Sequence, residues 1–448
     1  MIGPEIRHTV NRGASVAYQV FGQGPNDLMF LADWFTNLDF QWEDPAFRQV
    51  LEALGAFRRV IMFDKRGVGL SDPVRLDALP SIDDWATDAV AVLDAVGSPD
   101  AHIACAGGAG MLGIALAVNH ADRVRSLTLL GSTSRVTQAP DYEIGLEPEL
   151  AALAQPYFAE KWGTGEILGR AAPDRWADPA VRDWFARFEK QSASRGAVAE
   201  MQRMLMNLDL RARLPGIRVP TLIIHRAEDA ITPVEHARYL ASRIPGAEIR
   251  ELPGSAHLLF GDDPFEWIDE LREFCGDVRV GPPRVLSAIL HTDIVDSTHQ
   301  ANVMGDRLWD ERKERHEQIV RDTVRKFGGV LQDLKLVGDG HMSRFQDPEM
   351  AVRCALRLTE ELKQSNIEIR SSVHFGKVER ARTGISGSNV HLAARICEHA
   401  GPSEILVSRA VVEVLRPESD TSLEFEACGE FALKGFAHPT QVFRAKKR

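Results

Sequence analysis

Between residues 15 and 275, short apolar runs alternate with segments whose apolar residues recur at helical spacing. This alternation is typical of a mostly parallel sheet covered by helices. Strands are expected at 16–20, 27–31, 59–63, 101–104, 126–130, 221–224 and 248–252, and helices at 84–95 and 111–119. Residues 135–215 are rich in helix formers and contain several Trp and Phe residues, which predicts a helical cap over one end of the sheet.

A stretch with two glycines and two prolines, residues 276–283, interrupts this pattern. Such a composition is typical of a short, stiffened linker. A chain of 448 residues is also too long for one ordinary core. We therefore predict two domains, residues 1–276 and 285–448, joined by a linker at 277–284.

After the linker, the order of expected elements changes to βαββαβ with additions. The expected elements are strands at 285–290, 330–337, 341–345, 367–375 and 405–407, helices at 305–327, 348–363 and 390–400, a loop at 376–388 and a final hairpin near 423–444. This order predicts a ferredoxin-like sheet with helices on one face. The whole chain is thus expected to combine an α/β domain with an α+β domain.

Composition and charge narrow the class of protein. A net charge of -11 and a pI near 5.7 argue against nucleic acid as a main partner. No apolar run is long enough to span a bilayer, and no signal peptide is visible after Met1. The five scattered cysteines lack a C-x-x-C, which favours reduced thiols over disulfides or a zinc site. We therefore expect a cytoplasmic protein.

Two carboxylates follow strand-like segments of the second domain. Asp293 comes after the apolar run 285–290, and Asp339 lies in Gly338-Asp339-Gly340, a hairpin signal. A carboxylate at a strand end supplies a hard oxygen ligand, and the free N–H groups of the following turn face an anion. We expect Asp293 and Asp339 to hold divalent metal over a nucleoside triphosphate. A plain Asp-Gly turn is the alternative for Asp339.

The first domain resembles the α/β-hydrolase family over roughly residues 8–275. Phe63-Asp64-Lys65-Arg66-Gly67-Val68-Gly69-Leu70-Ser71-Asp72 is similar to that family's turn after an early strand, and 114–130 is similar to its helix and strand after the nucleophile. The resemblance implies that Asp229 occupies the acid position of a catalytic triad and His257 the base position.

The nucleophile position departs from the family pattern G-x-S-x-G. Counting from the flanking strand and helix places the serine position on Gly107, which carries no reacting atom. Asp33 stands where the family usually has a glycine, and a carboxylate there opposes a developing oxyanion. Cys105 would need a two-residue shift that the spacing does not support. We expect a hydrolase fold without hydrolase activity, with Asp229 and His257 as remnants and with a small-molecule pocket under the cap as the alternative role.

The second domain resembles the catalytic domain of class III nucleotidyl cyclases. The resemblance rests on four motifs in order: Asp293-Ile294-Val295-Asp296-Ser297-Thr298, Lys335-Leu336-Val337-Gly338-Asp339-Gly340, Gly387-Ser388-Asn389-Val390-His391-Leu392-Ala393-Ala394-Arg395 and Leu433-Lys434-Gly435. Together with the first domain, the chain resembles mycobacterial-type adenylyl cyclases with an N-terminal α/β-hydrolase domain. The resemblance implies conversion of ATP to 3′,5′-cyclic AMP and pyrophosphate in a homodimer, with two Mg²⁺ or Mn²⁺ ions per active site.

The same resemblance assigns roles to single residues. Asp293, Asp339 and the carbonyl of Ile294 are implied metal ligands. Arg395 is the implied transition-state arginine and His391, where the family usually has Asn, its neighbour one helical turn away. Lys335 is implied to read adenine, while the partner position falls on Gly384, and Lys434 is implied to meet the triphosphate.

Two alternative functions stay open beside the adenylyl cyclase. One is an ester or thioester hydrolase with an unorthodox nucleophile and a degenerate cyclase module. The other is a non-catalytic regulator that binds a nucleotide. The changes at His391 and Gly384 favour the second alternative if they abolish turnover.

Overall fold

The structure is a computed structural model of the chain. It describes residues 3–173, 175–176, 178–261, 263–276, 284–297, 300, 304–332, 340–381, 384–415, 422–436 and 439–447. By its internal contacts the chain divides into two compact units, Met1–Val278 and Arg279–Arg448, and each is described by itself. The division falls inside the linker predicted at 277–284, of which residues 277–283 lie outside the described part.

The first unit is built on an eight-stranded sheet in the order β1-β2-β4-β3-β5-β6-β7-β8. Its strands are β1 (Arg7–Asn11), β2 (Ala14–Phe21), β3 (Asp27–Leu31), β4 (Arg59–Phe63), β5 (Ala101–Ala106), β6 (Val124–Leu130), β7 (Thr221–Arg226) and β8 (Glu248–Leu252). The six strands β4, β3, β5, β6, β7 and β8 pair in parallel. The strands β1 and β2 add an antiparallel edge beside β4. The mostly parallel sheet predicted from the sequence is therefore present, with β1 as an unpredicted addition.

The unpredicted strand β1 depends on a two-residue turn. Arg12 and Gly13 both have positive φ, at 51° and 81°, and they join Asn11 to its partner Ala14. Two central residues with positive φ match the right-handed twist of the strands on either side, so this turn favours a hairpin. Inside the sheet, β3 and β5 are buried at every position, as expected for parallel strands that are covered on both faces.

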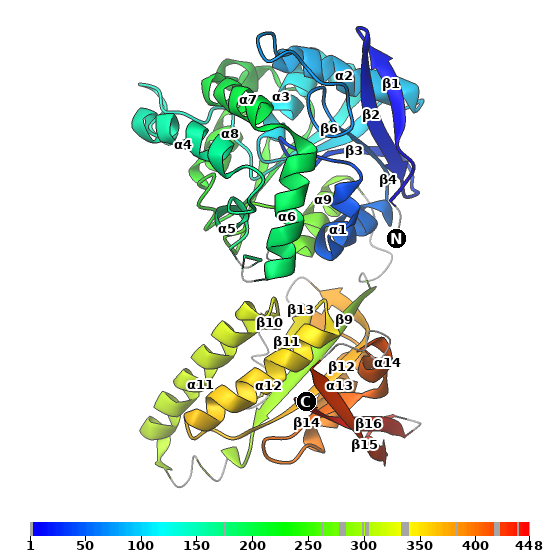
Figure 1. Ribbon diagram of the computed structural model, residues 1–448, viewed down its shortest axis with the longest axis vertical. Coiled ribbons are helices and arrows are strands. Elements are labelled where there is room, and N and C mark those ends of the chain that lie inside the picture. Colours follow the sequence, from blue (N-terminus) through cyan, green and yellow to red (C-terminus); the bar gives the residue numbers. More distant parts are fainter. Residues whose placement is uncertain are drawn as a thin grey trace. The chain divides into compact units, whose positions relative to one another are not determined.

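Helices cover both faces of this sheet. Outside the cap they are α1 (Pro45–Gly55), α2 (Ile82–Ala95), α3 (Ala109–Asn119), α8 (Glu235–Arg243) and α9 (Pro264–Phe274), with short 3₁₀ turns η1 (Phe40–Trp42) and η2 (Ala121–Arg123). Figure 1 shows α2 and α3 on one side of the sheet and α1 and α9 on the other. The start of α2 is fixed by a capping box between Ser81 and Asp84.

The cap covers nearly the range expected for it, 135–215, and its last turn ends at Gly216. It contains α4 (Pro148–Lys161), α5 (Leu168–Ala171), α6 (Pro179–Ser192), α7 (Arg195–Asn207) and the 3₁₀ turn η3 (Arg211–Gly216). Its aromatic residues hold it against the rest of the first unit. Trp184 of α6 meets the ring of Phe260 edge-on at 5.8 Å between ring centroids, and its indole N–H donates to the carbonyl of Phe40. The aromatic content of the segment therefore reflects packing of the cap.

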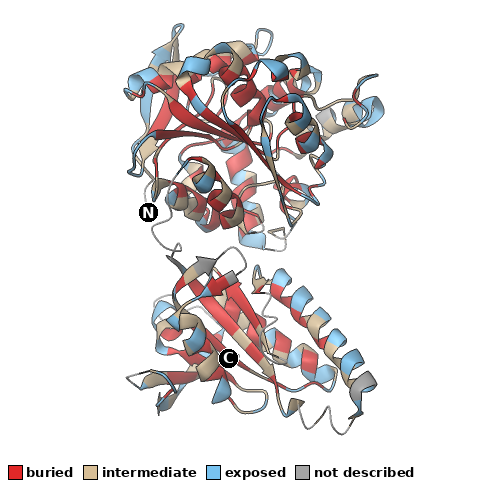
Figure 2. Ribbon diagram, turned by 180° about the vertical axis from the view of Figure 1, so that it is seen from behind, coloured by how far each residue is buried: buried red, intermediate tan, exposed pale blue. Residues whose placement is uncertain are grey.

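The second unit has its own eight-stranded sheet, in the order β10-β11-β9-β12-β14-β16-β15 with β13 paired to β12. Its strands are β9 (Arg284–Ile294), β10 (Val330–Gln332), β11 (His341–Phe345), β12 (Ile369–Ala381), β13 (Gly384–Ser386), β14 (Ile405–Ser408), β15 (Leu423–Phe431) and β16 (Thr440–Lys447). Its helices are α11 (Asp306–Lys326), α12 (Pro348–Gln364), α13 (Ser388–Glu398) and α14 (Arg409–Leu415). Figure 2 shows buried residues along the central strands and exposed ones on the outer helix faces.

Two expectations for this sheet are wrong. Residues 376–388 were expected to form a loop, but β12 continues to Ala381 and pairs with β13. Helices were expected on one face, whereas both faces of β9 are covered. Leu290 packs in the cluster that contains Leu358 of α12, and the next residue towards the N-terminus, Ile289, packs in the cluster that contains Ala393 of α13. Because side chains alternate along a strand, these helices lie on opposite faces.

No helix of the described residues is long and apolar enough to cross a membrane. All five cysteines are free: four are buried, and Cys428 is partly exposed.

Candidate active site

The turn between β5 and α3 has the strand-to-helix form that the sequence predicted around Gly107. Gly107 has φ +50°, and its N–H donates to the carbonyl of Leu130 on the neighbouring strand. Positive φ is costly for residues with a Cβ, so glycine is the residue that fits this turn most easily. Position 107 therefore has the backbone of a nucleophile turn and no side chain to react.

His257 and Asp229, which the family resemblance placed at the base and acid positions, meet at the carboxyl edge of the sheet. The Nδ1 atom of His257 lies 2.8 Å from Oδ2 of Asp229, while Oδ1 of Asp229 accepts from the N–H groups of Ile231 and Thr232. The backbone N–H of His257 donates to the carbonyl of Ala171 in the cap. The carboxylate is thus held from three sides, and it fixes the imidazole with Nε2 free to act as a base.

The charges around this dyad shift both pKa values. Burial lowers the pKa of His257, but the hydrogen bond and charge of Asp229 and the charge of Asp33 outweigh burial, so the pKa is raised from 6.5. Burial raises the pKa of Asp229, yet the His257 contact and two backbone N–H groups bring it below its usual range. Asp229 is therefore ionised at neutral pH and stabilises a positive charge on the imidazole.

Asp33 reaches into the space above Gly107. A Cβ on Gly107 would lie 2.6 Å from Oδ1 of Asp33 and 3.2 Å from Nε2 of His257. Oδ1 accepts from the N–H of Trp34 at 2.5 Å, and the carboxylate also accepts from the N–H of Gly108. These two N–H groups, one after β3 and one after the turn, are placed to form an oxyanion hole. The carboxylate of Asp33 occupies that hole.

Lys65, which follows β4, lies close to this carboxylate in an aromatic enclosure. Its Nζ is 4.4 Å from the ring centroid of Trp34, 5.5 Å from that of Phe35 and 5.6 Å from that of Trp85. Burial lowers the pKa of Lys65 to about 7, against the opposing charges of Asp33 and Asp64. Lys65 belongs to the motif Phe63–Asp72, but its role cannot be predicted from the sequence, because the enclosure is assembled from three separate segments.

A small cavity of about 30 Å³ adjoins the dyad. Its walls include Gly131, Ile224, Asp229, His257 and Trp267. A space of this size holds one or two water molecules where polar groups line it. The dyad therefore has room for water beside it.

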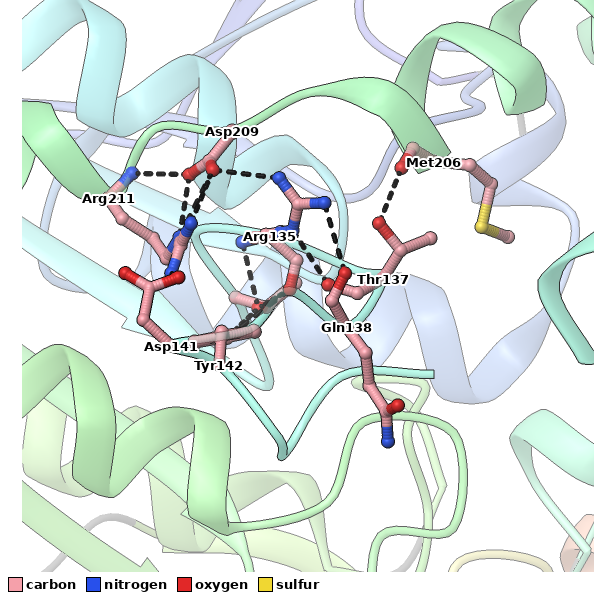
Figure 3. A network of polar contacts seen from close by, with 9 residues as sticks. Arg135, Thr137, Gln138, Asp141, Tyr142, Met206, Asp209 and Arg211 are labelled. Carbon is pink, nitrogen blue, oxygen red and sulfur yellow. Dashed lines mark hydrogen bonds and ion pairs between the residues drawn. The ribbon is translucent and has the colours of Figure 1, made fainter. Parts of the chain in front are cut away.

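A polar network ties the two ends of the cap together (Figure 3). Arg135 donates to the carbonyls of Thr137 and Gln138 and pairs with Asp209 at 2.8 Å. Arg211 pairs with the same Asp209 and, at 2.8 Å, with Asp141. The segments that enter and leave the cap are thereby joined, which holds the cap in place over the carboxyl edge of the sheet.

Cys105, the one cysteine near the turn, is not a candidate nucleophile. It is fully buried in β5, and burial raises the pKa of its thiol far above neutral. A Cβ on Gly113 of α3 would lie 2.5 Å from its Sγ, so the thiol points into the helix–sheet packing. Thiolate character is required for reaction, and this environment opposes it.

The residues predicted for the second unit are only partly brought together. Asp293 is the last residue but one of β9 and forms an ion pair with Arg370 of β12, with 2.6 Å between Nη2 and Oδ2. Ile294, which ends the strand, is buried. Lys335 and Asp339 lie outside the described residues. A Cβ on Gly340, the residue after Asp339, would lie 3.6 Å from Oδ1 of Asp293.

His391 and Arg395 both lie on α13, where His391 is exposed and Arg395 pairs with Glu398 of the same helix. Lys434 is exposed in the turn before β16, and Gly384 begins β13. No group of three or more His, Cys, Asp and Glu side chains able to hold a metal ion occurs among the described residues.

A parallel α/β sheet with a strand–turn–helix nucleophile turn and an Asp–His dyad at its carboxyl edge defines a hydrolase-type domain. The sequence pattern of the alpha/beta hydrolase family matches residues 32–271, more than half of the chain. The chain belongs to the alpha/beta hydrolase family.

Relatives agree with this assignment. The chain is 32% identical over 247 residues to a candidate carbamate hydrolase, RutD, of Azorhizobium caulinodans, covering 52% of this chain and 86% of RutD. It is 31% identical to rhodomycin D methylesterase DauP of a Streptomyces species, covering 49% of this chain and 80% of DauP. The crystal structure of a hydrolase from Pseudomonas aeruginosa is similar with a TM-score of 0.51 at 25% identity, covering 61% of this chain and 99% of that one.

These comparisons correct the prediction of an adenylyl cyclase. The relatives bear the names of hydrolases and esterases, and the matching family is a hydrolase family, so a lyase that forms cyclic AMP is contradicted. The prediction of two Mg²⁺ or Mn²⁺ ions per active site depended on the cyclase reaction and is wrong as well. The described residues offer no metal cluster, and Asp293 has Arg370 as its partner. The motifs of the second unit therefore led to a wrong prediction, adenylyl cyclase activity, for the whole chain.

Proposed function

We propose that the first unit is a hydrolase of a small organic substrate, in which His257 activates the attacking water. The observation that carries this proposal is the 2.8 Å contact between His257 Nδ1 and Asp229 Oδ2. Nε2 of His257 lies 3.2 Å from where a Cβ on Gly107 would be, so the free nitrogen faces the position of chemistry in this fold. RutD and DauP, by name a candidate carbamate hydrolase and a methylesterase, support hydrolysis as the reaction class.

The test is turnover of a panel of p-nitrophenyl esters, carbamates and epoxides by the full chain. His257→Ala is expected to lower turnover at least about a hundredfold, because general-base catalysis contributes on the order of 10²–10⁴. His8→Ala is the matched control, because His8 is exposed on the edge strand β1 and should leave turnover unchanged. Equal turnover by wild type and His257→Ala on every substrate would refute the proposal.

A second candidate role for this unit is the binding of a small molecule without turnover. It is favoured by one observation, the carboxylate of Asp33 in the oxyanion hole, which denies those N–H groups to a substrate oxygen. The panel separates the two roles. A substrate analogue that raises the melting temperature while no substrate is hydrolysed would establish binding alone.

For the second unit we propose a ferredoxin-like domain that binds a nucleotide and pairs two chains into a homodimer. The support is the βαββαβ order of its elements and the placement of His391 and Arg395 one turn apart on α13. Equilibrium dialysis with ATP tests binding, and light scattering tests the dimer. Binding that is unchanged in Arg395→Ala, or a monomer at all concentrations, would count against the respective part.

A further inference from the structure

A second histidine, His225 of β7, lies behind the dyad with a fully buried side chain. Its Nε2 lies 2.6 Å from the carbonyl oxygen of Thr232 and 3.7 Å from Oδ2 of Asp229. The same Oδ2 lies 2.8 Å from Nδ1 of His257. The carboxylate of Asp229 is therefore placed between two imidazoles, and the hydrolysis proposed above uses only one of them.

The contact with Thr232 decides which nitrogen of His225 carries the proton. A carbonyl oxygen only accepts, so Nε2 is the protonated nitrogen and Nδ1 holds the lone pair. Nδ1 is buried and has no hydrogen-bond partner among the described residues, so a proton there would lack an acceptor. Burial also lowers the pKa of this histidine. His225 is therefore neutral at neutral pH, and it donates through Nε2 alone.

His225 and Asp229 close the turn after β7 from the same side. Oδ1 of Asp229 accepts from the N–H groups of Ile231 and Thr232 at 2.8 Å and 3.0 Å, and Nε2–H of His225 binds the carbonyl of Thr232. His225 belongs to the strand, so its hydrogen bond fixes the turn relative to the sheet. At 3.7 Å its N–H is too far from Oδ2 for a hydrogen bond, but its dipole favours a negative charge there.

Packing leaves the carboxylate of Asp229 room to move. The cavity of about 30 Å³ beside the dyad is lined by His225, Asp229 and His257 among others. Side chains therefore do not press on the carboxylate from every side, as they would in a filled core. Its orientation toward His257 depends on the hydrogen bonds of the turn.

We propose that His225 is a positioning residue, which holds the turn 229–232 so that Oδ2 of Asp229 stays on Nδ1 of His257. This role rests on the hydrolysis proposed for the same site. His225 acts through Asp229 and touches no reacting atom. A base keeps its productive geometry when the groups that orient it are themselves held by hydrogen bonds. Without His225, the acid turn shifts and the base is less often aligned with its water.

Titratable groups from several elements surround the two histidines. Those that interact electrostatically with His225 are Asp229 and His257 from the loops after β7 and β8, Glu235 and His236 of α8, and Glu251 of β8. Those that do so with His257 are Asp229, Asp33 and His225. All of them except His225 remain in a His225 variant. A changed titration of His257 in such a variant therefore reports the loss of His225.

The test compares two amide side chains at position 225 in the full chain. The amide nitrogen of glutamine reaches as far as Nε2 of histidine and replaces its N–H, whereas that of asparagine reaches only as far as Nδ1. His225→Asn is expected to lower kcat for the best ester or carbamate of the panel about tenfold or more with KM unchanged, because small misplacements of catalytic groups are costly. His225→Gln is expected to stay within about twofold of wild type.

The second readout is the titration of His257 by NMR of histidine-labelled protein, with its resonance identified by its absence in His257→Gln. In His225→Asn the imidazole of His257 should titrate at lower pH than in wild type, since a displaced Asp229 stabilises the imidazolium less. His225→Gln should restore the wild-type midpoint. His102→Asn is the matched control, because His102 is also buried but lies at the opposite end of its strand, β5, with Ser126 as its partner.

The outcomes separate this inference from the proposed function. Turnover that depends on His257 but is equal in wild type and His225→Asn, with an unchanged His257 midpoint, overturns the positioning role and leaves the hydrolase standing. Equal losses of kcat in His225→Asn and His225→Gln also overturn it, because the N–H is then not what matters. A His257 midpoint that falls only in His225→Asn, without His257-dependent turnover of any substrate, supports the positioning role and refutes the hydrolase.

Discussion

Oδ1 of Asp33 lies 2.6 Å from the point that a Cβ on Gly107 would occupy, although the two residues belong to loops that follow different strands, β3 and β5. A contact of this length between a carbon and a carboxylate oxygen requires one of the two to move. The glycine and the carboxylate therefore depend on each other, and the dependence can be measured by double-mutant cycle.

Gly107→Ala is expected to destabilise the first unit more than Gly97→Ala does. Both glycines have positive φ, at +50° and +69°, which costs a residue with a Cβ about 1–3 kcal/mol. Gly97 has nothing within 4 Å of its Cβ position, so it serves as the matched control for the backbone cost alone. Urea unfolding gives both free energies.

The excess cost at Gly107 is expected to decrease in the Asp33→Ala background, because the oxygen at 2.6 Å is then gone and the contact with Nε2 of His257 at 3.2 Å remains. Coupling on the order of 1 kcal/mol between the two substitutions is the predicted result. Strict additivity of Gly107→Ala and Asp33→Ala would show that Asp33 does not occupy this space in solution.

His257 is expected to titrate above pH 6.5, because the hydrogen bond and charge of Asp229 outweigh burial and raise its pKa. A base must be neutral, so activity should rise with pH through this raised pKa and fall below it. Asp229→Asn removes the charge, so the imidazole resonances should then titrate at lower pH in an NMR experiment. An unchanged midpoint in Asp229→Asn would contradict the role assigned to the carboxylate.

Glu189 of α6 predicts a pH dependence of the cap. It is fully buried, accepts from the N–H groups of Gly163 and Gly165 at 2.9 Å, and has a pKa raised to about 7 mainly by burial. The unfolded chain releases this proton near pH 4.5 and the folded chain near 7, so stability is lost as pH rises through that window. The wild-type melting temperature should therefore decrease between these values more than that of Glu189→Gln.

The control for this prediction is Glu200→Gln, because Glu200 lies on α7 of the same cap in an ion pair with Arg203 near the surface. Its substitution should leave the slope of melting temperature against pH unchanged. Parallel curves for wild type and Glu189→Gln would mean that Glu189 ionises in the folded protein as it does in the unfolded chain.

The alternation of apolar and polar segments was sufficient to predict the parallel sheet and the helical cap, whereas the positions of Asp229 and His257 came from the resemblance to the α/β-hydrolase family. These features follow from local patterns and from motif order. The position of Asp33 was noticed in the sequence, but its reach into the space of Gly107 depends on how two loops pack, which no spacing along the chain encodes. Lys65 was missed for the same reason, because Trp34, Phe35 and Trp85 meet around it only in the fold.

The second unit shows the opposite error. The helices α11, α12 and α13 were placed close to their observed bounds, while the end of β12, the strand β13 and the helix α14 were not predicted. The metal chemistry inferred from Asp293 did not follow from the elements that were predicted. Asp293 could be located at a strand end from sequence, but its partner Arg370 lies across the β9–β12 pair, at a register that only the folded sheet defines. A strand-end carboxylate is thus a metal ligand or an ion-pair partner according to its neighbour.

The division into two units predicts two separable unfolding transitions, and Leu358 provides a way to assign them. Leu358 of α12 is fully buried in the core of the second unit, so Leu358→Ala should cost about 2–5 kcal/mol there. Calorimetry of the full chain should then show one transition shifted down and the other unchanged. Leu308→Ala is the matched control, because Leu308 is 45% exposed on α11 of the same unit and should shift neither transition measurably. A single transition that moves as a whole with Leu358→Ala would show that the two units unfold as one.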